Sequence, residues 1–174
     1  MLAAPDLQRG FTLIELLIGV VILAILFAAA APSFRSWIQN AQVRTAADSI
    51  SSGLQLARAE AVRRNTFVQF SLSGPLSTWS LGCVTPSTTC PSVIQSRSGA
   101  EGTSNAVVTV DNATVVFNGL GRANVVMNVN ITNPTGGDCQ IASGPTRCLN
   151  VIVSTGGQVR MCDPALPSSD PQGC

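Results

Sequence analysis

Residues 10–18 read Gly10-Phe11-Thr12-Leu13-Ile14-Glu15-Leu16-Leu17-Ile18 and begin an apolar run that reaches Ala31. As a helix that rises about 1.5 Å per residue, residues 11–31 would measure roughly 30 Å, which matches the hydrocarbon core of a bilayer. Glu15 places a carboxylate in this run, which costs about 2.5 kcal/mol or more inside a membrane. The sequence therefore predicts a membrane-spanning helix with a functional acid near its start.

Two ordinary interpretations of this run leave part of it unexplained. A secretory signal peptide could be cleaved at Ala29-Ala30-Ala31, but its apolar region would cover only about 7–15 residues. The observed run is longer and contains an acid. A plain membrane anchor fits the length but explains neither Glu15 nor the junction between Gly10 and Phe11.

The segment from Gly10 to Glu15 resembles the processing site of type IV prepilins and type II secretion pseudopilins. In that family a dedicated peptidase cuts after the glycine on the cytoplasmic side, and the new N-terminal residue is methylated. The resemblance implies that residues 1–10 are a leader peptide and that Phe11 is the methylated N-terminus. Glu15 would then be the fifth residue of the mature chain.

The composition argues against an enzyme. The chain of 174 residues allows one globular domain beyond the membrane helix. It has no histidine, tyrosine or lysine, so all ten basic residues are arginines. Most hydrolase and transferase mechanisms need a histidine or a reactive lysine. We therefore predict no catalytic site, no cofactor and no metal site, and the net charge of +1 indicates no strong field for nucleic acid.

The cysteines all lie beyond residue 82, in the part predicted to be exported, and an even number there favours disulfides. A zinc site is the alternative, but structural zinc sites usually have two close cysteine pairs, which this spacing lacks. Six cysteines allow fifteen pairings, and the sequence alone does not select one. We expect the sequential pairing, in which each bond closes a short loop: Cys83 with Cys90, Cys139 with Cys148, and Cys162 with Cys174.

The helical pattern continues beyond the membrane segment. Pro32 would bend or locally open the helix, and the alternative is that the helix ends there. After Pro32, apolar residues recur at mostly three- and four-residue steps, which predicts an amphipathic continuation over residues 32–65. The predicted packing stripe is Phe34, Trp37, Ile38, Ala41, Ala47, Ile50, Leu54, Ala57 and Ala61.

The period changes to that of strands near Asn65. Short alternating runs follow, separated by turn residues, and Thr155-Gly156-Gly157 is a hairpin signal. The runs are 67–72, 77–81, 92–96, 106–110, 114–117, 123–132, 149–154 and 158–161, with an irregular tail from Asp163. The predicted fold class is α+β: a long N-terminal helix packed on a mostly antiparallel β-sheet domain, with seven or eight strands.

Three downstream segments carry a second resemblance. They are Leu56 to Asn65, Val116 to Arg122 and Val151 to Arg160, and they resemble the GspH/FimT domain. That group contains the minor pilins FimU and FimT and the minor pseudopilins of type II secretion. The resemblance implies a pilin-like fold in which residues 66–174 form the periplasmic domain. It also implies a low-abundance subunit that is anchored once in the bacterial inner membrane and helps initiate or cap a filament.

The resemblance gives Glu15 an assembly role. In the family's proposed mechanism, the acid pairs with the α-amine of Phe11 on a neighbouring subunit, and residues 11–31 form the filament core. The partners would be the major pilin, other minor pilins or pseudopilins, and the prepilin peptidase. We expect a type IV pilus subunit of the FimU kind, and the alternative is a type II secretion pseudopilin.

Two further alternatives follow from the same sequence. The first is a DNA-binding minor pilin for natural transformation, in which Arg122, Arg147 and Arg160 would cluster. FimT proteins proposed for this role carry a Gly-Arg-x-Arg segment, whereas residues 157–160 read Gly-Gln-Val-Arg. We therefore favour scattered surface arginines over a nucleic-acid site. The second is a simple membrane-anchored periplasmic domain, which would keep its leader.

Overall fold

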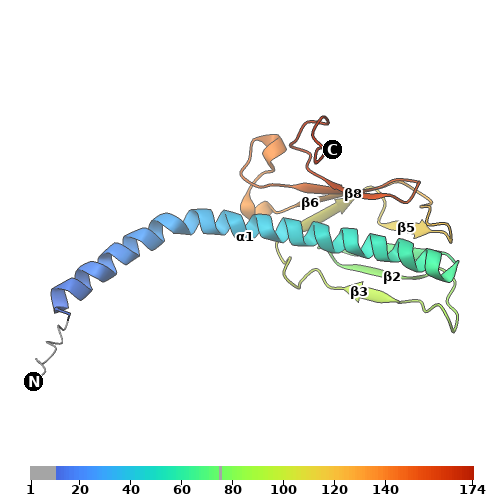
Figure 1. The fold of residues 1–174 in the computed structure, drawn as a ribbon, viewed down its shortest axis with the longest axis horizontal. Coiled ribbons are helices and arrows are strands. Elements are labelled where there is room, and N and C mark those ends of the chain that lie inside the picture. Colours follow the sequence, from blue (N-terminus) through green and yellow to red (C-terminus); the bar gives the residue numbers. More distant parts are fainter. Residues whose placement is uncertain (1–10, 75) are drawn as a thin grey trace, which may run out of the picture. The chain divides into compact units, whose positions relative to one another are not determined.

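The computed structural model describes residues 11–74 and 76–174, so the predicted leader and Gly10 lie outside the described residues. The chain divides into two compact units, Met1–Arg35 and Ser36–Cys174. Helix α1, Leu13–Arg64, begins in the first unit and ends in the second. All β-strands of the described residues belong to the second unit, which we call the C-terminal unit (Figure 1).

Helix α1 is assigned as helical throughout its 52 residues, Pro32 included. The alternative that the helix ends at Pro32 is therefore wrong, while the bend at Pro32 stays a prediction. At its other end, Asn65 adopts a left-handed backbone conformation with φ 49°. The N–H of Thr66 donates to the carbonyl of Ala61 at 3.1 Å, which closes the helix in a Schellman-type turn.

The predicted packing stripe is correct only in its second half. Five residues of the stripe are fully buried: Ala47, Ile50, Leu54, Ala57 and Ala61. The predicted stripe omitted two further residues that are fully buried, Val43 and Ala46. Phe34 and Trp37 are instead 60% and 65% exposed, and Ala41 is exposed. The buried face of α1 in the C-terminal unit includes Val43 and Ala46 because burial depends on where the sheets contact the helix and not on periodicity alone.

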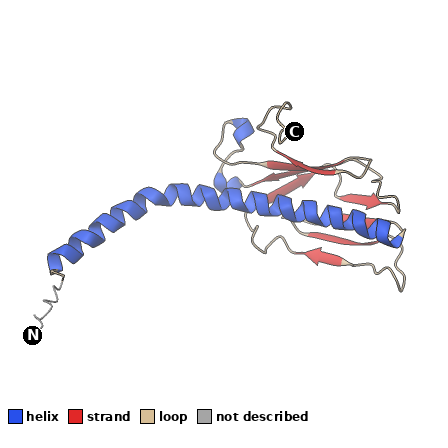
Figure 2. Ribbon diagram, in the orientation of Figure 1, coloured by secondary structure: helices blue, strands red, loops and turns tan. Residues whose placement is uncertain are grey.

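The strands form two antiparallel sheets (Figure 2). The first sheet has the order β3-β2-β1-β5 and the second the order β4-β6-β7-β8. The bounds are β1 Val68–Leu72, β2 Trp79–Cys83, β3 Gln95–Arg97, β4 Val107–Val110, β5 Thr114–Phe117, β6 Met127–Thr132, β7 Leu149–Val153 and β8 Val159–Cys162, with short 3-10 helices η1 Pro134–Gly136 and η2 Gln140–Ala142.

Strand β6 begins later than the run at 123–132 predicted. Asn124 does not pair with β7, because it bonds to β5 instead: its side-chain oxygen accepts from the N–H of Val116 at 2.8 Å. Its own N–H donates to the carbonyl of Val116 at 3.0 Å. Residues 118–126 therefore form one of the links between the two sheets, and regular pairing with β7 starts at Met127.

In the C-terminal unit, α1 packs on both sheets. Against the first sheet, the indole N–H of Trp79 donates to the buried hydroxyl of Ser49 at 2.9 Å, and the Trp79 ring lies 5.6 Å from that of Phe70. Gly53 makes this close approach feasible, because an added Cβ would lie 2.8 Å from the Phe70 ring. Beside the second sheet, the backbone N–H of Arg147, in the loop before β7, donates to the Asn40 side chain at 2.9 Å.

The β7–β8 hairpin contains the predicted turn. The N–H of Gly157 donates to the carbonyl of Ser154 at 2.8 Å, and the N–H of Ser154 donates to the carbonyl of Gln158 at 3.0 Å. Gly157 has φ 78°, so the loop is a type I turn followed by a left-handed residue. The turn also packs against the link between the sheets, because a Cβ at Gly157 would lie 1.8 Å from the carbonyl oxygen of Gly121.

Gly157→Ala should destabilise the C-terminal unit by about 3 kcal/mol or more, because backbone strain and a backbone clash add. The matched control is Gly156→Ala, whose added Cβ meets only the Ser154 hydroxyl at 3.6 Å. Urea unfolding of the detergent-solubilised chain measures both variants. Equal midpoints for the two variants would contradict the assigned turn.

Candidate functional site

Thr12 and Glu15 bond to each other at the start of α1. The hydroxyl of Thr12 donates to Glu15 Oε2 at 2.9 Å, and the backbone N–H of Thr12 donates to the same oxygen at 3.0 Å. In return, the Thr12 hydroxyl oxygen accepts from the backbone N–H of Glu15 at 3.3 Å. This reciprocal arrangement is a capping box, which satisfies donors that the first helical turn leaves free.

The capping role of Glu15 was not predicted, although the sequence contains its signal. Thr12 and Glu15 have the spacing S/T-x-x-E directly before an apolar run. From the sequence, Glu15 was expected only to need a partner from another subunit. The structure adds a local function, so the effect of removing the carboxylate has two components, helix capping and charge.

The apolar residues that follow Glu15 are all exposed within the first unit. Leu16, Ile22 and Phe27, for example, are 65%, 52% and 71% exposed. By length and composition, α1 is the one helix of the described residues that could cross a membrane, and its most apolar window has no buried part. An exposed apolar surface of this size needs lipid or neighbouring subunits to cover it.

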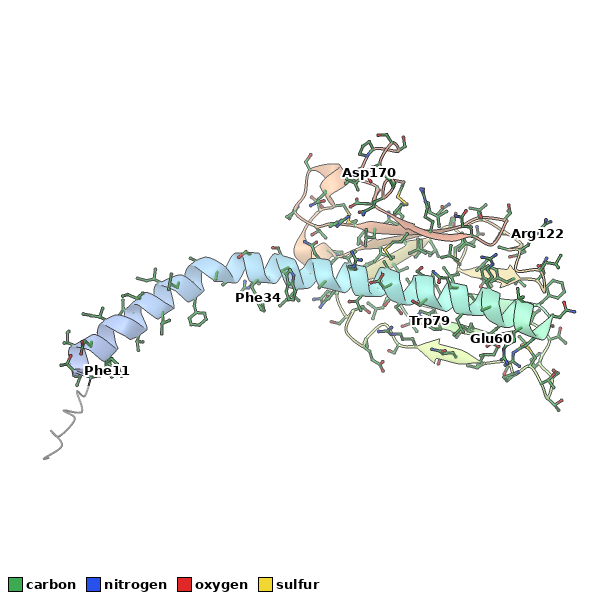
Figure 3. The ribbon with its side chains drawn as sticks, in the orientation of Figure 1. Phe11, Phe34, Glu60, Trp79, Arg122 and Asp170 are labelled. Carbon is green, nitrogen blue, oxygen red and sulfur yellow. A yellow bond between two sulfur atoms is a disulfide. The ribbon has the colours of Figure 1, made fainter. Side chains whose placement is uncertain are left out.

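Phe11, the residue predicted to become the N-terminus, is described and is 89% exposed (Figure 3). It lies just before the capping box, so cleavage before Phe11 would leave its α-amine within one turn of Glu15. Gly10, the other predicted site residue at this junction, lies outside the described residues. Phe11 is therefore an exposed apolar residue next to the capping box formed by Thr12 and Glu15.

The six cysteines form three disulfides between sequential neighbours: Cys83–Cys90, Cys139–Cys148 and Cys162–Cys174. The first ties the end of β2 to the loop before β3, and the last ties the C-terminal tail to the end of β8. These bonds use the sulfur atoms that a zinc site would need as ligands. Disulfides at all six positions indicate an oxidising compartment.

The three arginines of the DNA-binding alternative do not form one cluster. The guanidinium of Arg147 pairs with Asp163 at 2.6 Å, and that of Arg160 donates to the carbonyl of Gly173 at 3.1 Å. Both therefore bond to the C-terminal tail, which also carries Asp170 (Figure 3). Arg122 instead lies at the end of the unit where α1 terminates (Figure 3). Two of the three charges are already engaged within the chain.

Glu60, Arg63 and Arg64 form ion pairs in the last turns of α1. Glu60 accepts from Arg63 at 2.6 Å and from Arg64 at 2.7 Å, and Arg64 also donates to the carbonyl of Thr89. The hydrogen bond from Arg63, followed by that from Arg64, lowers the pKa of Glu60 below its ordinary value of 4.5. The Arg64 contact fastens α1 to the loop closed by Cys83 and Cys90.

Glu60→Gln should destabilise the C-terminal unit at pH 7 by about 1–2 kcal/mol, because it removes the charge from two hydrogen bonds. The pKa of Glu60 is lower in the folded state, so its contribution is complete above about pH 5 and disappears as the pH falls through the folded value. Urea unfolding should therefore show a difference from the parent at pH 7 that shrinks at pH 3. A difference independent of pH would contradict the ionic origin.

The observed parts define a class of protein. A capped, exposed apolar helix leads into a disulfide-bonded domain of antiparallel sheets, and the described residues hold no group of histidine, cysteine or acidic side chains suited to a metal ion. This arrangement is that of a pilin-like assembly subunit. The comparisons with known proteins then specify the family.

The chain belongs to the GspH family. The profile of that family, Type II transport protein GspH, matches residues 46–157, and the Prokaryotic N-terminal methylation motif matches residues 6–31. Both resemblances predicted from the sequence are thereby confirmed. Members of the family are pilin- or pseudopilin-type structural subunits, not enzymes.

Two solved structures share the fold. The type IV minor pilin FimU of Pseudomonas aeruginosa PAO1 has a TM-score of 0.57 and 18% identity, over 79% of this chain and 98% of that one. The minor pseudopilin EpsH from the Type 2 Secretion System of Vibrio cholerae has a TM-score of 0.55 and 11% identity, over 72% of this chain and 99% of EpsH. No curated protein matches the chain significantly. The predicted pilin-like α+β fold is confirmed.

Proposed function

We propose that this chain is a minor pilin that helps initiate or cap assembly of a type IV pilus. Prepilin peptidase would cut between Gly10 and Phe11 and Phe11 would then be methylated. The single-pass helix would hold the protein in the inner membrane until assembly, with the C-terminal unit in the periplasm. The three disulfides support a periplasmic location for that unit, since they need an oxidising compartment.

One observation carries the proposal: Glu15 lies at the first turn of an apolar helix that the first unit leaves uncovered. In a membrane, this turn would lie near the cytoplasmic face, where Glu15 can meet headgroups and water. In a filament, the apolar surfaces of neighbouring helices would cover one another, and the carboxylate would need a positive partner in a low-dielectric core. The α-amine of Phe11 on a neighbouring subunit provides that charge.

The test is a strain that lacks this subunit. An initiating or capping subunit is needed once per filament, so its loss should reduce the number of surface pili rather than shorten each one. Electron microscopy counts the pili, and expression of the parent chain should restore them. A normal number of pili would contradict the proposal.

The alternative, a pseudopilin of type II secretion, is favoured by the description of the family profile as a transport protein. It makes a different prediction for the same strain. Exoproteins should accumulate in the periplasm while pili remain normal. Measurement of secreted enzyme activity beside the pilus count separates the two functions.

A further inference from the structure

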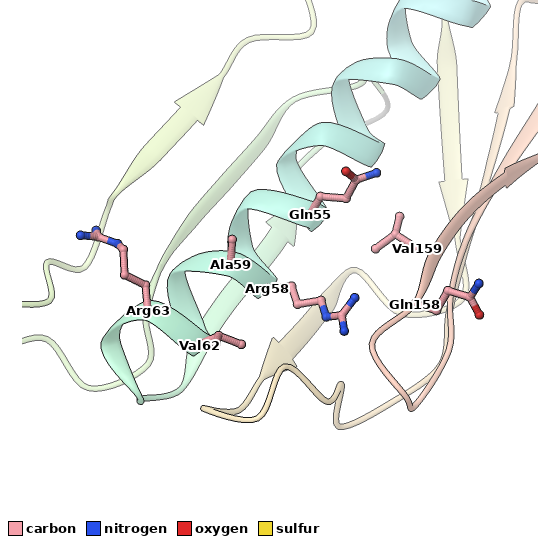
Figure 4. A pocket seen from close by; sticks show the side chains of 7 residues that line it. All are labelled: Gln55, Arg58, Ala59, Val62, Arg63, Gln158 and Val159. Carbon is pink, nitrogen blue, oxygen red and sulfur yellow. The ribbon is translucent and has the colours of Figure 1, made fainter.

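An open groove runs between the last turns of α1 and the start of β8. It has a volume of about 580 Å³ and is lined by Gln55, Arg58, Ala59, Val62 and Arg63 of α1 and by Gln158 and Val159 of the hairpin (Figure 4). Val62 on its rim is 50% exposed. The groove therefore combines an apolar surface with a guanidinium, which suits a partner that is apolar and negatively charged.

The groove is where the three segments singled out in the sequence meet. Arg58 belongs to the first segment, Gly121 to the second and Gly157 to the third. A Cβ added at Gly121 would lie 3.0 Å from Arg58 Nε, and one at Gly157 would lie 3.3 Å from the same atom. The Arg58 side chain therefore packs against Gly121 and Gly157, where a larger side chain would be in close contact with it.

Arg58 has no acidic partner among residues 11–74 and 76–174. The carboxylate next to it in sequence, that of Glu60, is already bound by Arg63 and Arg64. No hydrogen bond or ion pair of the described residues includes the Arg58 side chain. Figure 4 shows its guanidinium extending from α1 toward the hairpin that carries Gln158. The groove therefore holds a positioned charge that a ligand could neutralise.

Strand β8 is the last strand of its sheet, and the C-terminal tail bridges to the chain only after β8 ends, at Asp163, which leaves the edge at Val159 open. Ser154 and Gln158 form the hydrogen-bonded pair that closes the hairpin, and bonded and non-bonded pairs alternate along an antiparallel ladder. The next pair, Val153 with Val159, is then a non-bonded one. The N–H and C=O of Val159 consequently point away from β7, toward the edge.

We propose that this groove binds an extended segment of a neighbouring pilin-type subunit, which adds to the edge of β8 and places a carboxylate on Arg58. Strand addition explains the open edge, and the acidic residue explains the unpaired guanidinium. The inference rests on the proposed function, because it takes the partner from the same filament.

The strands of a second copy, within the described residues, contain no acidic residue and therefore do not supply such a segment. Its acidic residues that are free of ion pairs in the described residues, such as Glu101, Asp138 and Asp170, lie in turns or loops outside the strands. Asp111, in the turn before β5, is held by Asn128. We therefore assign the segment to a different subunit of the assembly.

The experiment places a photoreactive benzoylphenylalanine in the full-length chain in its native host. At Val62 it reports on the groove, and at Val93, which is 57% exposed in the loop before β3, it serves as a negative control. At Leu16 it reports on packing of the apolar helix. Mass spectrometry of the adducts should join Val62 to an acidic segment of another pilin-type subunit.

Two pairs of variants test the chemistry of the adduct. Arg58→Glu should lower the yield from Val62 about tenfold or more, as for a lost charged hydrogen bond, while Arg97→Glu on β3 should not. Reversal of the partner's acid to arginine should restore the yield. Val159→Pro removes the outward N–H, which an edge strand tolerates, and should lower the yield, whereas Val159→Ala should not.

The outcomes separate this inference from the proposed function. Adducts from Leu16 but none from Val62 would overturn the groove assignment and leave the subunit in its filament. An adduct from Val62 to a second copy of this chain, or one unaffected by Arg58→Glu, would also overturn it. Absence of pilin adducts from both positions would contradict the proposed function itself.

Discussion

Glu15→Ala is expected to yield a protein that is processed and held in the membrane but excluded from filaments. The change leaves the Gly10–Phe11 junction and the apolar run intact, so neither cleavage nor insertion should suffer. In the filament core, however, the Phe11 amine of a neighbouring subunit would face no carboxylate. A buried charge that loses its partner costs about 3–5 kcal/mol, which corresponds to a loss of incorporation of about a hundredfold or more.

The capping box makes alanine an ambiguous substitution, and Glu15→Gln resolves the ambiguity. Glutamine at this position can still accept from the N–H of Thr12, so it preserves the cap while it removes the charge. Thr12→Ala has the opposite effect, because it removes the hydroxyl of the cap and keeps the carboxylate. If charge pairing selects the register, Glu15→Gln should behave like Glu15→Ala and Thr12→Ala should assemble.

The measurement compares the amount of each variant in sheared filaments with the amount in membranes, both by immunoblot. Mass analysis of the membrane form checks that each variant has lost residues 1–10 and gained one methyl group. Normal incorporation of Glu15→Gln would show that the carboxylate acts as a helix cap and not as an ionic partner.

The long helix was predictable because its signals are local. The apolar run and the spacing of buried residues from Ala47 to Ala61 both follow from a period of 3.6 residues. Phe34, Trp37 and Ala41 of the predicted stripe have the same period but are exposed, and Ile38 is half-buried. Periodicity identifies a helical face, whereas its burial depends on where the other elements of the fold begin.

The groove at Arg58 could not have been predicted by the same means. Its lining comes from two segments far apart in sequence, and two glycines beside Arg58, Gly121 and Gly157, act by lacking a side chain. The sequence therefore suggested Arg122, Arg147 and Arg160 as a possible cluster in the DNA-binding alternative and gave no reason to single out Arg58. Charge alone does not reveal which arginine remains unpaired, since the partners Asp163 and Gly173 lie in a tail that only the fold places.

Gly10→Val is expected to abolish cleavage, so that the chain keeps residues 1–10 and Phe11 is never methylated. A peptidase that cuts after glycine must bring the backbone of this residue close to its catalytic groups, and a β-branched side chain blocks that approach. The methylation motif matched at residues 6–31 includes this junction. Intact mass of the membrane protein measures the result directly.

Gly19→Val is the matched control for this variant. Gly19 lies in the same apolar helix, and a Cβ added there has no atom within 4 Å in the structure, so the chain should still be cleaved. A mature-length Gly10→Val protein would show that the junction is assigned wrongly. A retained leader has a further consequence, because Phe11 then has an amide in place of a charged α-amine. Gly10→Val should therefore fail to enter filaments even though its Glu15 carboxylate is intact. The missing charge is the positive α-amine of Phe11.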